Sequence, residues 1–195
     1  MTTLYICRHG ETENNKNKRL SGWIDTPLTT TGIQNTQAIA AKLQDVAFDK
    51  VVSSDLGRAF ITAYLVLQEL GSNTEIERTS RLREVNYGDL GNQSYVDPNS
   101  AYPKLTPEEN AHFIPQGGES LVRMQTRVVK FVAELTEANS GKTILVFAHD
   151  GTINALHAYY KDENIGLTDA ASHNAHDFVA KIVYEKGNIT SFVEV

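Results

Sequence analysis

An apolar run near the start of the chain, residues 4–7, ends on Arg8 and His9. A strand end that only has to turn needs neither a permanent cation nor a titratable ring. A second apolar run, residues 142–148, ends on His149. If both runs are parallel strands of one sheet, their carboxyl ends meet at the edge where α/β sheets bind ligands. The sequence therefore predicts that the two histidines face one site.

Arg58 and Glu84 extend this set of chemically active side chains. Arg58 falls in the first turn of a predicted helix, where the helix dipole disfavours a cation unless an anion binds there. Glu84 lies in a predicted loop between Arg81 and Arg83. Phosphoryl transfer needs such parts, because its transition state spreads negative charge over oxygens that forked guanidinium groups can hold.

The two remaining residue types fit the same chemistry. A neutral imidazole is a competent nucleophile, and a carboxylic acid can protonate a leaving oxygen and later accept a proton from water. A second imidazolium would hold an equatorial oxygen. Since four cationic groups would already surround the phosphate, we expect neither a metal ion nor an organic cofactor.

The elements that position these residues alternate along the chain. Apolar runs favour strands at 3–7, 48–54, 74–78 and 142–149, and helical spacing favours helices at 29–44, 55–70, 119–139 and 151–160. The last residues, 177–195, are typical of a hairpin turning at Gly187 and Asn188. This order predicts an α/β fold, a three-layer α/β/α sandwich with a mainly parallel sheet and an antiparallel C-terminal edge.

Residues 86–118 interrupt the alternation. They hold four of the five prolines and no long periodic element, so we expect a lid insertion over the strand ends. The whole chain, residues 1–195, is expected to form a single domain, in keeping with its length.

Local patterns predict how three of the helices begin and pack. Asp55 is a natural N-cap for the helix at 55–70. In the helix at 29–44, apolar residues at near-helical spacing are expected to face the core: Ile33, Ala40 and Leu43. In the helix at 119–139, the expected buried stripe is Leu121, Met124, Val128, Phe131, Val132 and Leu135.

The composition excludes several classes of protein. A net charge of −6 argues against general nucleic-acid binding, which needs a basic surface. No apolar run reaches the roughly 20 residues of a membrane span, and the N-terminus lacks the pattern of a secretory signal. The single cysteine, Cys7, cannot form an internal disulfide. We therefore expect a cytoplasmic protein with no nucleic-acid or membrane partner; nothing in the sequence indicates its oligomeric state.

Six sequence blocks follow one another in order and span nearly the whole chain. They are RHGET at 8–12, LSGWIDTPLTTTG at 20–32, SSDLGRAFITA at 53–63, LREVNYGDLG at 82–91, GGES at 117–120 and VFAHDGTI at 146–153. Together they resemble the histidine phosphatase superfamily, the phosphoglycerate-mutase-like proteins, far more specifically than a lone RHG tripeptide would.

The resemblance implies a covalent phosphohistidine and a role for each matching residue. It implies that His9 is the nucleophile and that Glu84 is the proton donor and later acceptor. Arg8, Arg58 and His149 would form the phosphate clamp. Positions expected to line the substrate pocket are Gly10, Asn15, Ser21, Gly22, Tyr87, Asp150 and Gly151.

Asp150 departs from the family pattern, which most often has glycine after the second histidine. A carboxylate beside a bound dianion weakens binding unless it points away or caps the next helix. We expect Asp150 to cap the helix; the competing idea is that it shares proton transfer with Glu84.

Three functions remain open at the level of sequence. Between Glu84 and Arg123 the only Lys or Arg is Lys104, which favours a phosphatase acting on a small phosphorylated metabolite over a phosphoglycerate mutase. Free phosphate would be the other ligand, and 2,3-bisphosphoglycerate would be needed only by a mutase. An inactive, phosphoester-binding regulatory protein is the third possibility. A further pair, His173 and His176, has no third ligand nearby, so we expect no metal site there.

Overall fold

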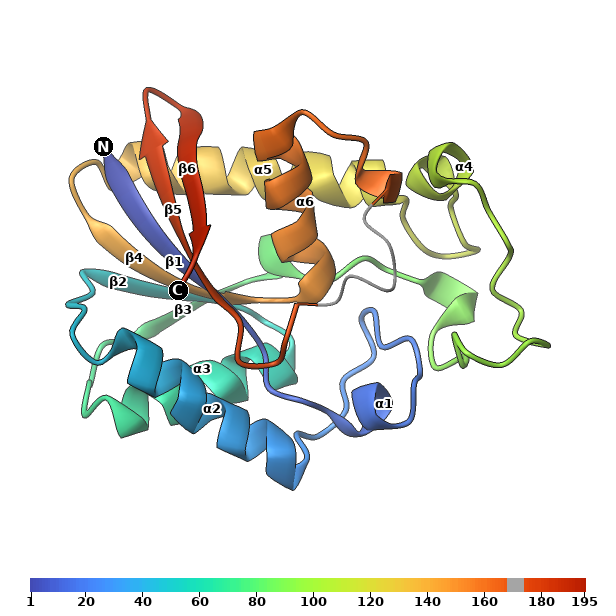
Figure 1. Ribbon diagram of the computed structural model, residues 1–195, viewed down its shortest axis with the longest axis horizontal. Helices are drawn as coiled ribbons and strands as arrows, with labels where there is room; N and C mark the ends of the chain where they lie inside the picture. Colours follow the sequence, from blue (N-terminus) through green and yellow to red (C-terminus); the bar gives the residue numbers. More distant parts are fainter. Residues whose placement is uncertain (168–173) are drawn as a thin grey trace.

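The computed structural model describes residues 1–167 and 174–195. Figure 1 shows a central sheet with helices on both faces. The elements are β1 (Thr2–Arg8), α1 (Glu13–Lys16), α2 (Thr30–Leu43), β2 (Lys50–Ser54), α3 (Gly57–Glu69), β3 (Ile76–Thr79), η1 (Ser80–Leu82), η2 (Gly88–Leu90), α4 (Pro107–His112), α5 (Leu121–Ala138), β4 (Thr143–Ala148), α6 (Asp150–Lys161), η3 (Ile165–Leu167), β5 (Val179–Glu185) and β6 (Asn188–Glu194).

The sheet has six strands in the order β3-β2-β4-β1-β5-β6. Strands β1 and β4 pair in parallel, as do β2 with β4 and β2 with β3. Strand β5 pairs antiparallel with β1, and β6 with β5. The predicted α/β fold, with its mainly parallel sheet and antiparallel C-terminal edge, is confirmed.

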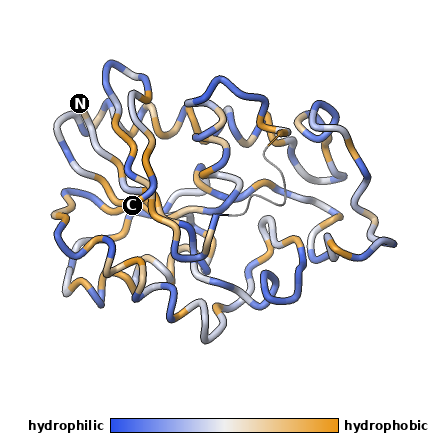
Figure 2. Tube along the Cα trace, viewed as in Figure 1, coloured by the Kyte–Doolittle hydropathy of each residue, from blue (hydrophilic) through white to orange (hydrophobic). Residues whose placement is uncertain are grey.

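Alternate side chains of the central strands enter two separate cores. Leu4 and Ile6 of β1 pack in the core beneath α5 and α6, whereas Cys7 packs in the core that includes α2 and α3. Successive residues of a strand point to opposite faces, so a strand covered on both sides must be apolar throughout. Figure 2 shows hydrophobic segments along the strands and polar ones in the connecting loops.

The helices pack largely as their spacing predicts. In α5 the stripe from Met124 to Leu135 is buried, and Leu121 is partly buried against it. In α2, Ala40 and Leu43 are buried, but Ile33 is 50% exposed. The prediction for Ile33 was wrong because α2 packs through the face that carries Thr36 and Ile39.

The C-terminal hairpin forms, with its turn one residue earlier than predicted. Lys186 and Gly187 form the two-residue loop, and both have positive φ, of 52° and 83°. This is the backbone geometry of the turns that match strand twist in tight hairpins. Asn188 is therefore the first residue of β6, paired with Glu185.

Residues 86–118 extend the molecule beyond the carboxyl ends of β1 and β4 (Figure 1). The segment contains η2 and the short helix α4, which a capping box between Thr106 and Glu109 stabilises. The first part of the segment is bound to the loop after α1, because the Leu20 amide donates to the Gln93 carbonyl at 2.9 Å. Helix α4, in the second part of the segment, contacts η3 and α5.

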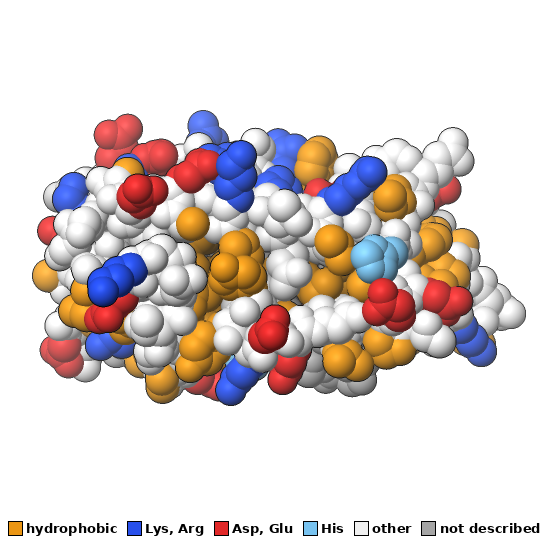
Figure 3. Space-filling model, turned by 90° about the horizontal axis from the view of Figure 1, so that it is seen from above, with side chains coloured by type: hydrophobic (Ala, Val, Ile, Leu, Met, Phe, Trp, Pro, Cys, Tyr) orange, Lys and Arg blue, Asp and Glu red, His pale blue; other side chains and the backbone are white. Residues whose placement is uncertain are grey.

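The face seen in Figure 3 carries basic and acidic side chains interspersed with hydrophobic ones. Within the described ranges, 1–167 and 174–195, no helix is long and apolar enough to cross a lipid bilayer.

Candidate active site

The two strand-end histidines lie against each other. His9 follows β1, and His149 follows β4 as the N-cap residue of α6. The two strands stay paired to their last residues, and the His9 amide donates to the Ala148 carbonyl at 3.1 Å. Their ring centroids are 5.2 Å apart, and both side chains are buried. The parallel pairing of β1 with β4 thus brings together residues that are far apart in the sequence.

The hydrogen bonds of His9 define which ring nitrogen carries its proton. Arg58 donates from Nε to Nε2 of His9 at 3.1 Å, so Nε2 is the unprotonated nitrogen. The proton is then on Nδ1, which donates to the Gly10 carbonyl at 2.8 Å. Burial, followed by the charges of Arg58 and Arg8, holds the pKa of His9 well below its ordinary value. His9 is therefore a neutral imidazole with its lone pair on the side of Arg58.

Arg58 is held by the loop that precedes α2. Its guanidinium donates to the Gly22 carbonyl at 2.7 Å and to the Ile24 carbonyl at 3.1 Å. Gly22 has φ +51°, and a Cβ there would lie 3.0 Å from the Tyr87 ring and from the Val85 carbonyl, so the turn requires glycine. With an exposed fraction of 1%, Arg58 is fixed against His9 rather than solvated.

The N-terminus of α3 is capped by Asp25, not by Asp55. The N-cap residue is Leu56, which makes no side-chain capping bond. Asp25 accepts hydrogen bonds from the Gly57 and Arg58 amides and from the Arg58 side chain. The carboxylate of Asp55 instead binds Arg83 in a bidentate pair at 2.7 and 2.6 Å. The prediction that Asp55 caps this helix was wrong. The capping carboxylate comes from Asp25, in a loop that is distant in the sequence.

Arg8 is the second buried guanidinium near His9. It donates to the Asn174 carbonyl and lies 3.8 Å from the Asp150 carboxylate. Its Nε is buried without a protein partner among the described residues. A buried donor without a partner costs free energy that an anionic ligand would recover.

Glu84 is bound at the start of α6. Its carboxylate accepts from the Gly151 amide at 3.1 Å and from the Val85 amide at 2.9 Å, while Trp23 donates to its backbone carbonyl at 2.8 Å. A Cβ on Gly151 would lie 2.2 Å from the carboxylate, so this contact requires glycine. Burial, with a smaller contribution from Asp150, raises the pKa of Glu84 above its ordinary value. A raised pKa favours the protonated acid.

Asp150 does not cap α6. The N-cap position belongs to His149, and Asp150 is the first helical residue. Its carboxylate accepts from the backbone and side-chain nitrogens of Asn174, both at 2.9 Å, and faces Arg8. The capping prediction was wrong because the chain enters the helix one residue earlier, so this carboxylate is left to bind Asn174.

The predicted pocket residues differ in how closely they join this cluster. Gly10 approaches the backbone of Gly32 so closely that a Cβ would lie 2.3 Å from its carbonyl oxygen. Ser21 has a buried hydroxyl with no partner in the described part of the chain. Asn15 instead uses its side-chain oxygen to cap α1 through Thr12.

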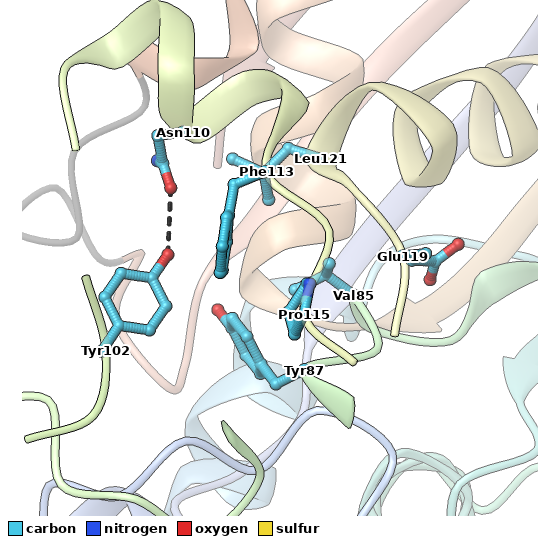
Figure 4. A pocket seen from close by; sticks show the side chains of 8 residues that line it. All are labelled: Val85, Tyr87, Tyr102, Asn110, Phe113, Pro115, Glu119 and Leu121. Atoms are coloured by element: carbon cyan, nitrogen blue, oxygen red, sulfur yellow. Dashed lines mark hydrogen bonds between the residues drawn. The ribbon is translucent and has the colours of Figure 1, made fainter. Parts of the chain in front are cut away.

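Tyr87 connects the site to the insertion. Its ring lies beside Gly22, and burial followed by the charge of Glu84 raises its pKa well above the ordinary value. Figure 4 shows that Tyr87 lines a small pocket together with residues of the insertion. The other lining residues are Val85, Tyr102, Asn110, Phe113, Pro115, Glu119 and Leu121.

Four residues near the cluster were not identified as site residues from the sequence: Asp25, Ser54, Thr62 and His176. The Thr62 hydroxyl accepts from the Gly10 amide at 3.0 Å and donates to the Arg58 carbonyl at 2.7 Å. Nδ1 of His176 lies 3.1 Å from the His9 carbonyl, and the two rings are 5.8 Å apart. These contacts join elements that are remote in the sequence. The motif blocks at 20–32 and 53–63 contain Asp25, Ser54 and Thr62 and offered the only signal for them, whereas His176 lies outside every block.

Metal binding was considered in the sequence at His173 and His176. His173 lies outside the described residues. Within the part of the chain that the structure does describe, no group of three or more His, Cys, Asp or Glu side chains is arranged to hold a metal ion.

The fold and this arrangement define an α/β protein whose paired histidines and buried arginines meet at the carboxyl edge of the sheet. The family model described as Histidine phosphatase superfamily (branch 1) matches residues 4–192. The chain belongs to this superfamily.

Similarity to individual proteins extends over most of the chain. The adenosylcobalamin/alpha-ribazole phosphatase of Escherichia coli is 34% identical over 78% of this chain and 76% of its own length. The 2,3-bisphosphoglycerate-dependent phosphoglycerate mutase of Cytophaga hutchinsonii is 31% identical over 88% of this chain and 84% of its own length. The solved structure of Bacillus stearothermophilus YhfR is 29% identical, with a TM-score of 0.89 over 99% of this chain and 96% of that one.

Proposed function

We propose that the protein is a metal-independent phosphatase that hydrolyses small phosphomonoesters through a phosphohistidine on His9. The observation that carries this proposal is the neutral His9, whose Nε2 lone pair faces the buried Arg58 at 3.1 Å. A phosphoryl group entering between them would receive the Arg58 N–H on an oxygen and leave the lone pair free to attack.

In the first half-reaction, Nε2 of His9 forms a bond to phosphorus as the bond to the leaving oxygen breaks. Glu84, whose raised pKa favours the protonated acid, gives its proton to that oxygen and becomes a carboxylate. The phosphorylated ring is then cationic. Its Nδ1–H remains bound to the Gly10 carbonyl, which stabilises that charge.

In the second half-reaction, a water molecule attacks phosphorus and the bond to His9 breaks. The Glu84 carboxylate takes a proton from that water, which restores the acid and releases orthophosphate. Arg8, Arg58 and His149 hold the equatorial oxygens through both steps, where the transition state spreads its charge. Ser21 has an unpartnered hydroxyl among the described contacts and is assigned to the same pocket.

The arginines around the site favour hydrolysis over mutase activity. A mutase must grip a second acidic group on its substrate. Arg81 is paired with Glu134 at 2.7 Å, and Arg83 is paired with Asp55 and lies over the Trp23 ring. The similarity to a protein named alpha-ribazole phosphatase supports a phosphorylated metabolite as substrate, and the similarity to a mutase supports the alternative.

The first test is hydrolysis of 4-nitrophenyl phosphate in the presence of a chelator. We expect release of phosphate without added metal, and loss of turnover by at least about a thousandfold in His9→Ala, because the nucleophile is then missing. Gln93→Ala, an exposed change outside the cluster, is the matched control. Full turnover in His9→Ala would refute the assignment of the nucleophile.

Two further outcomes separate the alternatives. Interconversion of phosphoglycerates that requires a 2,3-bisphosphoglycerate primer, without net hydrolysis, would establish the mutase. Binding of phosphate without turnover and without acid-labile labelled phosphate on His9 would establish the inactive, regulatory protein.

A further inference from the structure

His149 has one polar contact within the described part of the chain. Its Nε2 lies 2.8 Å from the hydroxyl of Ser54, and both residues are fully buried. Its Nδ1 is buried and has no partner among the described residues. Ser54 is the last residue of β2, which pairs with β4, and His149 directly follows β4, so both side chains lie at the carboxyl ends of neighbouring strands.

The hydrogen bonds of Ser54 indicate the direction of this contact. A serine hydroxyl has one proton to donate and can accept two hydrogen bonds. The Ser54 oxygen already accepts from the Leu56 amide at 3.4 Å, and no acceptor for its proton other than His149 is found among the described residues. A buried hydroxyl that donates no hydrogen bond costs free energy, so the Ser54 hydroxyl donates to Nε2 of His149.

His149 itself is neutral, so the expectation of a second imidazolium at this position was wrong. Burial, together with the charges of Arg58, Arg8 and Arg127, holds its pKa well below the ordinary value. A neutral imidazole has a single proton, and if Nε2 accepts from Ser54, that proton is on Nδ1.

We propose that Ser54 is a positioning residue that holds His149 in the Nδ1–H form and thereby directs this N–H at a phosphoryl oxygen. The second half of the proposal, that this N–H binds a phosphoryl oxygen, rests on the proposed function. In the opposite tautomer, Nδ1 would present a lone pair to the anion, and the interaction would be repulsive. The partner that fixes a histidine tautomer is often as important as the histidine itself.

The same strand supplies a control variant. Ser53 is as buried as Ser54, but its hydroxyl donates to the Ser54 carbonyl at 2.9 Å and does not contact His149. Ser53→Ala therefore removes a hydroxyl of the same kind at the same depth. Ser54→Thr retains the hydroxyl at the critical position and should restore what Ser54→Ala loses.

The tautomer is measured directly by nitrogen NMR of the free protein with labelled histidine, using His149→Asn for assignment. In the wild type, Ser53→Ala and Ser54→Thr, we expect Nδ1 to show the shift of a protonated nitrogen and Nε2 that of an unprotonated one. In Ser54→Ala, the protonated form of Nε2 should appear. A wild-type signal with the proton on Nε2 would overturn the proposal, whether or not the protein is a phosphatase.

Kinetics test the second half. For 4-nitrophenyl phosphate, kcat/KM should fall about ten- to a hundredfold in Ser54→Ala, as for partners that orient metal-bound histidines, and should stay near wild type in Ser53→Ala. Recovery in Ser54→Thr completes the expected pattern. Wild-type kcat/KM in Ser54→Ala would refute the role of Ser54 and leave the proposed function standing. Absence of turnover in the wild type would refute the proposed function, and with it the second half of this proposal.

Discussion

At the scale of single residues, the site surrounds two neutral imidazoles with guanidinium groups. His9 and His149 both have pKa values well below the ordinary one, first because they are buried and then because Arg58 and Arg8 are close. Neutrality is what the proposed nucleophile requires, so the cations proposed to hold phosphate oxygens also keep the lone pair of His9 available.

Glu84 carries the opposite perturbation, which gives Glu84→Gln two measurable effects. We expect kcat to fall about a hundred- to ten-thousandfold for an alkyl phosphate, because an alkoxide needs a proton to leave. The loss should be much smaller for 4-nitrophenyl phosphate, whose leaving group is a weak base. Equal losses for the two substrates would contradict a role as general acid.

The stability effect of the same variant follows from the sign of the pKa shift. The folded-state pKa of Glu84 lies above its ordinary 4.5, so the unfolded chain ionises first as the pH rises. Folding stability is therefore lost as the pH rises from the unfolded toward the folded pKa. Glu84→Gln should unfold at higher temperature than wild type at pH 7 to 8, and the difference should disappear well below pH 4.5.

At the scale of elements, the loop before α2, residues 22–25, connects α3 to the Glu84 loop through hydrogen bonds. Asp25 binds the first amides of α3, Gly22 and Ile24 bind the Arg58 guanidinium, and Trp23 binds the Glu84 carbonyl. This one irregular segment therefore positions both Arg58, which is proposed to bind phosphate, and Glu84, the proposed acid.

Removing the Asp25 carboxylate should affect catalysis as well as stability. We expect Asp25→Ala to lose about 1 kcal/mol of unfolding free energy through the missing cap, and about tenfold in kcat because Arg58 is less well oriented. Asp55→Ala is the matched control, since Asp55 is the adjacent carboxylate that makes no cap. An unchanged kcat with a lower KM would mean that Asp25 acts only through its charge.

How far such details could be predicted depends on whether the contact is local. The strand-end histidines were predictable because apolar runs and parallel pairing determine where strand ends meet. The Asp25 cap was not, because the carboxylate comes from 32 residues away and a plausible cap, Asp55, stood next to the helix. Similarly, Ser53 and Ser54 point to opposite faces of the sheet, and only the folded structure shows that the Ser54 hydroxyl is the one that reaches His149.

At the scale of the whole molecule, the cluster exists only when the sheet is complete. Its members come from β1, α3, the Glu84 loop and the start of α6, and each is held by contacts to another of these segments. A ligand that binds them all should therefore stabilise the folded chain as a unit.

Orthophosphate should raise the unfolding temperature. At a hundred times its Kd, a ligand adds about 2.7 kcal/mol, which corresponds to roughly 5–10 °C for a chain of this size. The shift should be largely lost in Arg8→Gln and retained in Arg19→Gln, because Arg19 is exposed and binds the Asn92 carbonyl. Equal shifts in both variants, measured by differential scanning fluorimetry, would place phosphate elsewhere.

The central position of β1 also bears on how the protein is made. Leu4 of β1 pairs with Ile144 on one side and with Ile182 on the other. Both neighbours leave the ribosome long after β1 does, so this apolar strand has no sheet partner until the chain has been made at least as far as Ile144. Pairings that distant slow folding and leave strand edges exposed until the partners arrive.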